Sequence, residues 1–266
     1  VVGDEPEPES DLALARRYAP VLYFHPQEIF RPQPVNVIVE QARLRRSRRL
    51  WFDTNVLLAL DPLDLFRLES DRSYFLDVWY GDEGGSAYTN YSAHRAFYEA
   101  VLNPAAGGPP VTVYVHVVRD EADRVAIQYW ALYFYNDWFN KHEGDWEMIQ
   151  VMLGADGHPG WVVLSQHHGG TRRAWLQASI EEDTHPVVYV ALGSHANYFV
   201  GDEIYPNSQT IGDRKITIPD RTGTVGRVIP DLILLPELER LAAAPNDWPE
   251  AVWLPFRGHW GEVTTQ

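Results

Sequence analysis

Five short apolar runs, each followed by a turn sequence, are the feature that most constrains how this chain can fold. They span residues 111–118, 126–135, 147–153, 160–165 and 187–192. The runs are rich in Val, Ile, Tyr and Trp, which favour strands, and the first alternates in side-chain type as a half-buried strand does. Regularly spaced short strands separated by turns are typical of an antiparallel β-sandwich. We therefore expect a mainly β fold, an antiparallel β-sandwich with short helices at its periphery.

The rest of the chain predicts short helices around the sandwich. Residues 11–18 have helical spacing after Ser10, and residues 232–244 resemble a second helix that Pro236 interrupts early. Residues 35–39 fit a strand or the start of a helix equally well. We expect residues 11–266 to form a single β-sandwich domain with an N-terminal helical segment, and residues 1–10 to be a flexible acidic tail.

The charge of the chain limits the partners it can bind. It has 266 residues with 22 basic and 37 acidic side chains, a net charge of -15. A nucleic-acid partner requires a basic surface, so this charge argues against one. The densest basic cluster has five arginines in residues 43–49, and a solvated helix face or loop explains it better than an anion site.

Two absences in the sequence exclude further classes of site. The chain has no cysteine, which rules out disulfides, thiolate nucleophiles and cysteine-based zinc sites. It also lacks an apolar run of 18 or more residues, so we expect no transmembrane segment.

Polar residues are concentrated between the second and third apolar runs. Within twelve positions lie six groups that can bind a metal or move a proton: Asn136, Asp137, His142, Glu143, Asp145 and Glu147. Alternate residues of a strand share a face, so Asp145 and Glu147 lie on the side of Ile149, Val151 and Leu153, which should point inward. Two adjacent buried carboxylates repel each other unless a cation lies between them.

This arrangement predicts one divalent metal ion. The predicted ligands are Asp137, His142, Asp145 and Glu147. A set dominated by oxygen favours calcium or magnesium, whereas added imidazoles would favour zinc. The alternative is a salt bridge from the two inward carboxylates to Lys141 or an arginine.

Histidines at two other strand ends suggest a possible catalytic role for the same region. His167 and His168 follow the fourth run, and His195 follows the fifth. If these strand ends share an edge with the carboxylates, His168, His195 and Glu143 become candidate catalytic residues beside an open, water-accessible metal. The alternative for the histidines is a hydrogen-bonded role in loops. The sequence has no phosphate loop, no G-x-S-x-G elbow and no H-E-x-x-H helix.

Six linked motifs resemble a known family. They are YAPVLYFHPQEIFRP, QYWALYFYNDW, HEGDWEMIQV, LSQHHGG, HPVVYVALGSHANYF and FRGHWGE, in this order from Tyr18 to Glu262. They resemble the bacterial branch of the vacuolar protein sorting-associated protein 62 family. The family name does not imply a sorting role in bacteria.

HEGDWE is also similar to part of the GHRHDWE heptapeptide of the necrosis- and ethylene-inducing-peptide-like proteins. Those proteins are secreted β-sandwich cytolysins that hold calcium or magnesium near the heptapeptide and bind sphingolipid sugars. The resemblance puts the family's first histidine on His142, its aspartate on Asp145 and its glutamate on Glu147. Its upstream aspartate corresponds to Asp137 across a shorter spacing. Two positions differ, because the family's second histidine is Gly144 and its arginine is Glu143 here, and the family's disulfide cannot form.

Three functions follow as hypotheses. In the first, a secreted or cell-surface protein uses the ion to bind a glycan or lipid head group, with membrane lysis as one outcome that the resemblance suggests. In the second, a metal-dependent hydrolase or lyase acts on a small-molecule substrate with the histidines beside the metal. In the third, the ion is purely structural.

Overall fold

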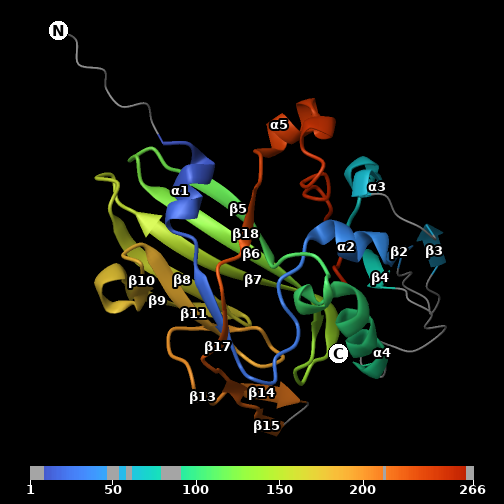
Figure 1. Cartoon of the computed structure of the whole chain (residues 1–266). Coiled ribbons are helices and arrows are strands. Elements are labelled where there is room, and N and C mark those ends of the chain that lie inside the picture. The colour runs from blue at the N-terminus through green and yellow to red at the C-terminus, as the bar shows by residue number, and fades with distance from the viewer. Residues whose placement is uncertain (1–8, 47–53, 58–61, 79–90, 212–213, 262–266) are drawn as a thin grey trace.

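The computed structural model describes residues 9–46, 54–57, 62–78, 91–211 and 214–261. Most of residues 1–10, the predicted tail, lie outside this described part. Two larger sheets form the body of the molecule, with helices and small sheets around them (Figure 1). The fold is mainly β with short peripheral helices, as the sequence predicts.

The first sheet has six strands in the order β18-β5-β6-β7-β8-β9. Their bounds are β5 Thr112–Arg119, β6 Val125–Asn136, β7 His142–Leu153, β8 Pro159–Gln166, β9 Gly169–Ala174 and β18 Asp231–Leu234. Strands β5 to β9 are antiparallel neighbours along the chain, and β18 joins β5 in parallel. Four of the five predicted strands are found here, with β6 and β7 longer than expected.

The second sheet contains the fifth predicted strand and faces the first. Its order is β10-β11-β1-β17, and β12 also pairs with β11. The strands are β1 Val21–Phe24, β10 Ile180–Glu181, β11 His185–Val190, β12 Asn197–Tyr198 and β17 Val225–Val228. Strands β1 and β11 are parallel, so the sandwich is antiparallel except at this pair and at β18 with β5.

Apolar residues of both sheets form one core cluster. Phe24 and Val190 of the second sheet belong to the same cluster as Ile149, Val151 and Leu164 of the first. Tyr129 of β6 is one of the fully buried aromatic residues, and it donates a hydrogen bond to the Ala15 carbonyl in the N-terminal helix at 2.8 Å. This contact ties that helix to the inner face of the first sheet.

Small sheets and helices complete the fold. The small-sheet strands are β2 Ala42–Arg46, β3 Thr54–Leu57, β4 Tyr74–Val78, β13 Ile204–Tyr205, β14 Ser208–Ile211, β15 Arg214–Thr217 and β16 Asp220–Arg221. The α-helices are α1 Asp11–Arg17, α2 Val35–Glu40, α3 Pro62–Arg67, α4 Tyr91–Phe97 and α5 Leu238–Ala243. A π-helical turn, η1 Tyr98–Leu102, continues α4, and 3-10 turns lie at η2 Pro104–Ala106, η3 Trp175–Gln177 and η4 Pro245–Asp247.

The structure corrects two local predictions. The predicted helix at 232–244 is wrong in its first half, because those residues form β18, which gains a full backbone ladder on β5 before Pro236. The arginine-rich segment is neither a helix face nor a loop where it is described. Arg45 lies in β2 and pairs with Asp77 of β4 at 2.8 Å, while residues 47–49 lie outside the described residues. Residues 35–39 are helical in α2.

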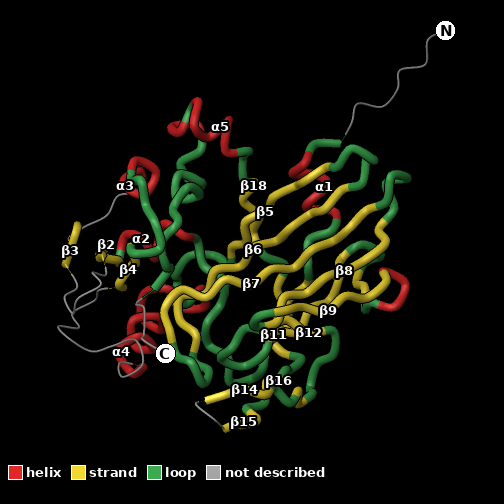
Figure 2. The backbone as a smooth tube through the Cα atoms, turned by 180° about the vertical axis from the view of Figure 1, so that it is seen from behind, coloured by secondary structure: helices red, strands yellow, loops and turns green. Residues whose placement is uncertain are grey.

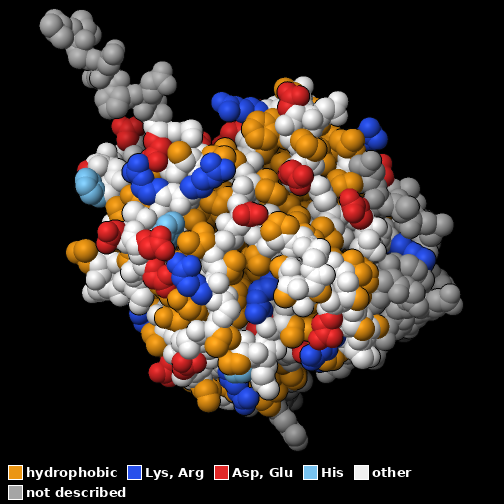
Figure 3. All heavy atoms as spheres, viewed as in Figure 1, with side chains coloured by type: hydrophobic (Ala, Val, Ile, Leu, Met, Phe, Trp, Pro, Cys, Tyr) orange, Lys and Arg blue, Asp and Glu red, His pale blue; other side chains and the backbone are white. Residues whose placement is uncertain are grey.

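The surface carries side chains of all types (Figure 3), and the described helices are short. On the face shown in Figure 3, acidic, basic and apolar side chains are interspersed. Within the described ranges, no helix is both long and apolar enough to cross a lipid bilayer.

Candidate functional site

The predicted site residues lie at the end of the hairpin formed by β6 and β7. Asn136 ends β6 and pairs in register with His142, which begins β7, so the connecting turn covers only residues 137–141. Glu147 is 6% exposed and lies on the buried face of β7 with Ile149. The inward orientation that the sequence predicts for this face is therefore found.

Asp145 is the centre of a buried chain of polar contacts. One of its oxygens, Oδ2, lies 2.9 Å from Nδ1 of His195 and accepts a hydrogen bond from the Asn136 amide at 3.2 Å. On the far side of the His195 ring, Nε2 lies 3.8 Å from Oε2 of Glu28. The imidazole is 0% exposed and stacks flat on the Tyr133 ring at 3.8 Å. His195 is therefore held between two carboxylates.

Backbone geometry brings His195 to this position. It lies in the turn after β11, where Gly193 and His195 both have positive φ, +75° and +53°. A Cβ at Gly193 would lie 2.6 Å from the Asp137 carbonyl oxygen, so only glycine lets this turn approach the β6–β7 turn. The Gly193 N–H donates to Glu28 Oε2 at 2.6 Å, which fixes Glu28 in the same place.

The charges alternate along this row of side chains, from Asp145 through His195 to Glu28. Burial opposes ionisation of Asp145, but its contacts with His142 and His195 outweigh it and hold the Asp145 pKa below its usual value. Burial alone would also lower the pKa of His195, but its contacts with Asp145 and Glu28 raise that pKa to about 9. The Glu28 pKa is lowered despite burial, by His195 and by backbone N–H groups. At neutral pH the row is carboxylate, imidazolium, carboxylate.

Glu147 is the carboxyl group that this row leaves without a cation. Burial and then the negative charge of Asp145 raise its pKa well above the usual value. Its hydrogen-bond partner is the Ser165 hydroxyl of β8, which also accepts the Met148 N–H at 2.8 Å. Two inward carboxyl groups therefore share one region, and the second of them favours its protonated form.

His142 points its free nitrogen at Asp145. Its Nδ1 lies 2.6 Å from the Asn140 carbonyl, to which it donates, and its Nε2 lies 3.6 Å from Asp145 Oδ1. Donation from one ring nitrogen to a backbone carbonyl is the usual way in which a metal-ligating histidine is oriented. Two atoms about 2.1–2.4 Å from one ion are roughly 3–4 Å apart, so this pair matches two ligands of a common cation.

Two predicted site residues point elsewhere. The Asp137 carboxylate forms an ion pair with Lys141 across the turn. Glu143 contacts His94 of α4 at 2.8 Å and accepts the Val78 N–H at 3.1 Å. Gly144, with φ of +63°, breaks the regular alternation of β7 between Glu143 and Asp145. As a result Glu143 bonds to α4 and β4, and its predicted role as a base beside a metal stays a prediction.

The four predicted ligands thus only partly fit a metal ion as they stand. His142 and Asp145 face each other, whereas Glu147 bonds Ser165 and Asp137 bonds Lys141. In the part of the chain that the structure describes, no three His, Asp or Glu side chains are placed to hold one ion. A metal site here requires Glu147 to turn from Ser165 toward Asp145. The alternative prediction was a salt bridge from the two carboxylates to Lys141 or an arginine. The cationic side chain beside Asp145 is instead His195.

The other two histidines line a neighbouring cavity. His167 contacts Asp220 at 2.6 Å, and Asp220 also accepts hydrogen bonds from Ser194 and Tyr198 at 2.6 and 2.7 Å. The cavity measures about 470 Å³ and is lined by Gln166, His167, His168, Tyr198, Tyr205, Pro206, Asn207 and Ser208. Gln166 of this lining donates to the Asn197 carbonyl at 2.8 Å, and the Asn197 amide lies 3.4 Å from Ser165, the partner of Glu147. His168 is an exposed lining residue of this cavity and His195 is buried beyond it.

These positions bear on the catalytic hypothesis. A general base must accept a proton, and His195 is held in its protonated form by two carboxylates. Ser194 bonds Asp220 while His195 bonds Asp145, so the neighbouring serine and histidine do not form a nucleophile–base pair. The hydrolase hypothesis stays a prediction without a geometric argument in its favour.

Three members of the network escaped prediction from the sequence. Glu28 follows β1 in a turn, Asp220 lies between Pro219 and Arg221, and Ser165 is the last residue but one of β8. None stands in a motif with metal or catalytic spacing. The only sequence signal was Glu28 itself, a carboxyl flanked by apolar Ile29 and Phe30.

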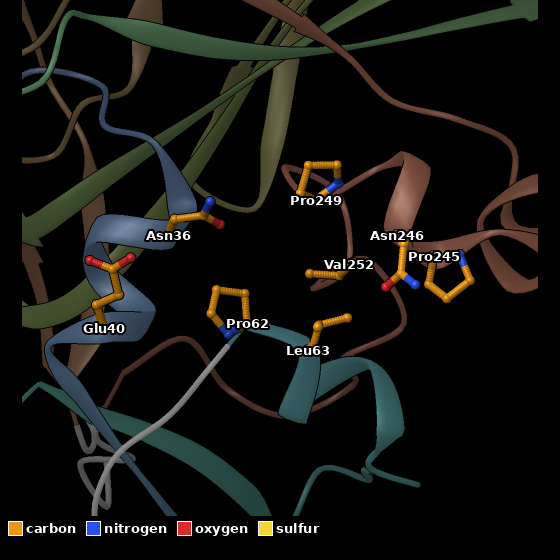
Figure 4. A pocket seen from close by; sticks show the side chains of 8 residues that line it. All are labelled: Asn36, Glu40, Pro62, Leu63, Pro245, Asn246, Pro249 and Val252. Carbon is orange, nitrogen blue, oxygen red and sulfur yellow. The ribbon is translucent and has the colours of Figure 1, made fainter.

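A different depression lies away from the network. It measures about 470 Å³ and is formed by α2, the start of α3 and residues 245–252. In Figure 4, Asn36 and Glu40 reach it from α2, and Pro245 and Pro249 from the C-terminal part of the chain. Glu40 is its one acidic lining residue, so it offers no comparable chemistry.

Comparisons with known proteins place the chain in a family. The family model for vacuolar protein sorting-associated protein 62 matches residues 5–262. A search among curated proteins found no match.

The chain is also similar, at low sequence identity, to several solved structures. One, described as "Toxin fold for microbial attack and plant defense", is 16% identical, covers 91% of this chain and 81% of its own, and has a TM-score of 0.43. NLPPya in complex with mannosamine is 16% identical, covers 86% and 77%, and has a TM-score of 0.40. Necrosis and Ethylene inducing Protein 2 from the causal agent of cocoa's Witches Broom disease is 12% identical, covers 86% and 76%, and has a TM-score of 0.40.

The family match extends over nearly the whole chain and includes all six motifs quoted above. It spans the N-terminal helix, both sheets of the sandwich and the C-terminal segment that packs on β7. The chain therefore belongs to the vacuolar protein sorting-associated protein 62 family.

Proposed function

We propose that this chain is a binding protein that holds one divalent cation at the inward carboxyl pair of β7 and uses it to bind the head group of a glycan or lipid. The observation that carries the proposal is Glu147, a buried carboxyl group whose pKa is raised by burial and by the charge of Asp145. A cation between the two groups would let both ionise. Asp145, Glu147 and His142 are the proposed ligands, with Asp137 as a fourth if it leaves Lys141.

Calcium or magnesium is the favoured ion, and zinc the alternative. Two or three carboxylates with one imidazole form an oxygen-dominated set, which hard cations prefer. We also propose action outside the cell or at its surface. Calcium sites of extracellular modules bind with dissociation constants of about 10⁻⁴–10⁻³ M, so a weak site suffices there.

The cavity beside the network is the proposed ligand site. It combines hydrogen-bonding side chains with Tyr205, which stacks on Tyr198 at 3.9 Å between ring centroids. Binding sites commonly pair apolar and aromatic walls with a few well-placed polar groups. Its path to Glu147 through Asn197 and Ser165 would couple ligand binding to the ion.

Binding to glycan arrays and to liposomes that display neutral glycolipids, with calcium and with chelator, tests this function. We expect binding that the chelator abolishes and that Tyr205→Ala weakens by about tenfold, which is about 1.4 kcal/mol. Trp161→Ala is the matched control, because Trp161 is a 40% exposed aromatic at the other end of β8 from the cavity. Binding that is equally strong with chelator would contradict the role of the ion, and equal weakening by both variants would contradict the role of the cavity.

A further inference from the structure

A further cavity, with mostly apolar walls, lies on the outer face of the six-stranded sheet, opposite to the face that carries Glu147. Trp146 and Glu147 are neighbours in β7, so they point to opposite faces. Glu147 faces the core, whereas Trp146 lines a cavity of about 540 Å³ between the sheet and the C-terminal part of the chain. Figure 2 shows this outer face from behind, with α5 and the following segment beside β18 and β5. The cavity is thus separated from the carboxyl network by the sheet itself.

Indole rings dominate its walls. Its apolar lining includes Trp130, Trp146, Trp253, Leu235, Leu238 and Leu254, and we call it the indole pocket. Trp146 and Trp253 pack on each other with ring centroids 5.3 Å apart, and Tyr114 meets Trp253 edge-on at 5.0 Å. These contacts fix the rings, so the pocket is preformed. Its size falls in the range of about 300–1,000 Å³ that small-molecule sites occupy.

One end of the indole pocket is polar. His116 of β5 and Gln128 of β6 are register partners on the outer face, and Gln128 bonds Gln150 of β7 at 3.0 Å. Glu237 lies at the same end, with its Oε1 3.3 Å from His116 Nε2. The Glu237 side chain is 60% exposed, and Leu238 beside it is 53% exposed. An apolar wall therefore meets a solvent-accessible carboxylate at the mouth.

We propose that the indole pocket binds a small cationic amphiphile, with its alkyl or ring body against the indoles and its ammonium group near Glu237. The face of an aromatic ring attracts a cation, and the indole of tryptophan does so more strongly than the rings of tyrosine or phenylalanine. Glu237 is the acidic lining residue at the mouth, and the whole chain has a net charge of -15. An anionic amphiphile with the same tail would meet repulsion at this end. The inference is independent of the proposed cation site.

Calorimetric titration with decyltrimethylammonium, below its micelle concentration and in the presence of a chelator, tests the proposal. We expect saturable binding of one molecule per chain, at least about tenfold tighter than binding of decanoate, because charge and cation–π contacts together contribute about 1.4 kcal/mol or more. Glu237→Gln should reduce this preference to within about threefold while leaving tail binding in place.

Two matched variants locate the site. Trp130→Ala should weaken decyltrimethylammonium binding by at least about tenfold, whereas Trp161→Ala, which removes a 40% exposed indole outside the pocket, should change it less than about twofold. Leu238→Ser, at a half-exposed position, provides a second test if Trp130→Ala does not fold. The absence of saturable binding, tighter binding of decanoate, or equal losses in Trp130→Ala and Trp161→Ala would overturn the proposal.

Discussion

At the scale of single residues, His195 has a role that its sequence context did not reveal. The sequence predicts that the inward carboxylates of β7 need a bound cation. In the structure His195 supplies a positive charge to Asp145 from within the protein. Its second nitrogen faces Glu28, so this charge is already shared between two carboxylates. Glu147 remains the inward carboxyl group that burial and the charge of Asp145 keep from ionising. A divalent ion would therefore change the charge of Glu147 more than that of Asp145.

The pKa of His195 predicts how stability depends on pH. In the folded protein the pKa of His195 is about 9, above its ordinary value of 6.5, so the folded state takes up a proton that the unfolded state lacks between these pH values. This stabilisation is complete below the unfolded pKa and is lost as pH rises through the folded pKa. We expect the free energy of unfolding to fall between pH 6.5 and 9 by up to about 1.4 kcal/mol per pH unit. Urea unfolding across this range measures it, and a flat profile would contradict a protonated His195.

Substitutions of Glu147 and Asp145 should have different effects on the stability of the metal-free protein. The raised pKa of Glu147 means that its ionisation destabilises the metal-free fold as pH rises above 4.5. Glu147→Gln should therefore leave the metal-free protein equally stable or stabilise it by about 1–3 kcal/mol at pH 7. Asp145→Asn removes an ionised partner of His195 and should destabilise it by about 3–5 kcal/mol. Thermal unfolding in chelator compares them, and a larger loss in Glu147→Gln than in Asp145→Asn would refute this account.

At the scale of elements, the β6–β7 hairpin shows what the sequence could and could not predict. The runs of apolar and aromatic residues located both strands, because such residues favour a buried sheet. The predicted ends of the strands at the turn were wrong. The polar residues from His142 to Asp145 were placed before the third strand, although the backbone pairing of β6 and β7 continues to Asn136 and His142. Side chains from other elements satisfy these polar groups, and local patterns do not encode such long-range partners. Figure 2 shows that the hairpin curves away from the sheet at this end.

Gly144 holds the C-terminal segment against this hairpin. Its φ is +63°, and a Cβ there would lie 1.8 Å from the Trp260 carbonyl oxygen. Gly157 has a similar φ of +75° with nothing within 4 Å of the added Cβ, so it is a matched control.

Replacing each glycine by alanine separates the cost of a positive φ from the cost of the clash with the Trp260 carbonyl. Gly157→Ala should cost about 1–2 kcal/mol, the penalty of a left-handed residue with a Cβ. Gly144→Ala should cost at least about 3 kcal/mol or prevent folding, because backbone must also move. Equal losses in urea unfolding would mean that the contact with Trp260 does not constrain the fold.

At the scale of the whole molecule, the sequence predicted the architecture better than the site. The strand series and the family motifs indicated the β-rich sandwich, because burial patterns recur along each strand. The site was only partly predictable, since His142, Asp145 and Glu147 are joined by Glu28, His195 and Ser165 from three other places in the chain. The parallel pairing of β1 with β11 brings Glu28 and His195 to the same end of the sandwich, and no local pattern reveals that pairing.

The central claim is that the inward carboxyl pair of β7 binds a divalent cation. Calorimetric titration of chelator-treated protein with calcium, and separately with magnesium and zinc, tests it most directly. Glu147→Gln is the informative variant, because it should fold at least as well as the unsubstituted protein, and Glu121→Gln in the exposed turn after β5 is the control. We predict one ion per chain for the unsubstituted protein and for Glu121→Gln, and at least about tenfold weaker binding for Glu147→Gln. Equal binding by all three proteins, or no binding by any, would contradict the claim.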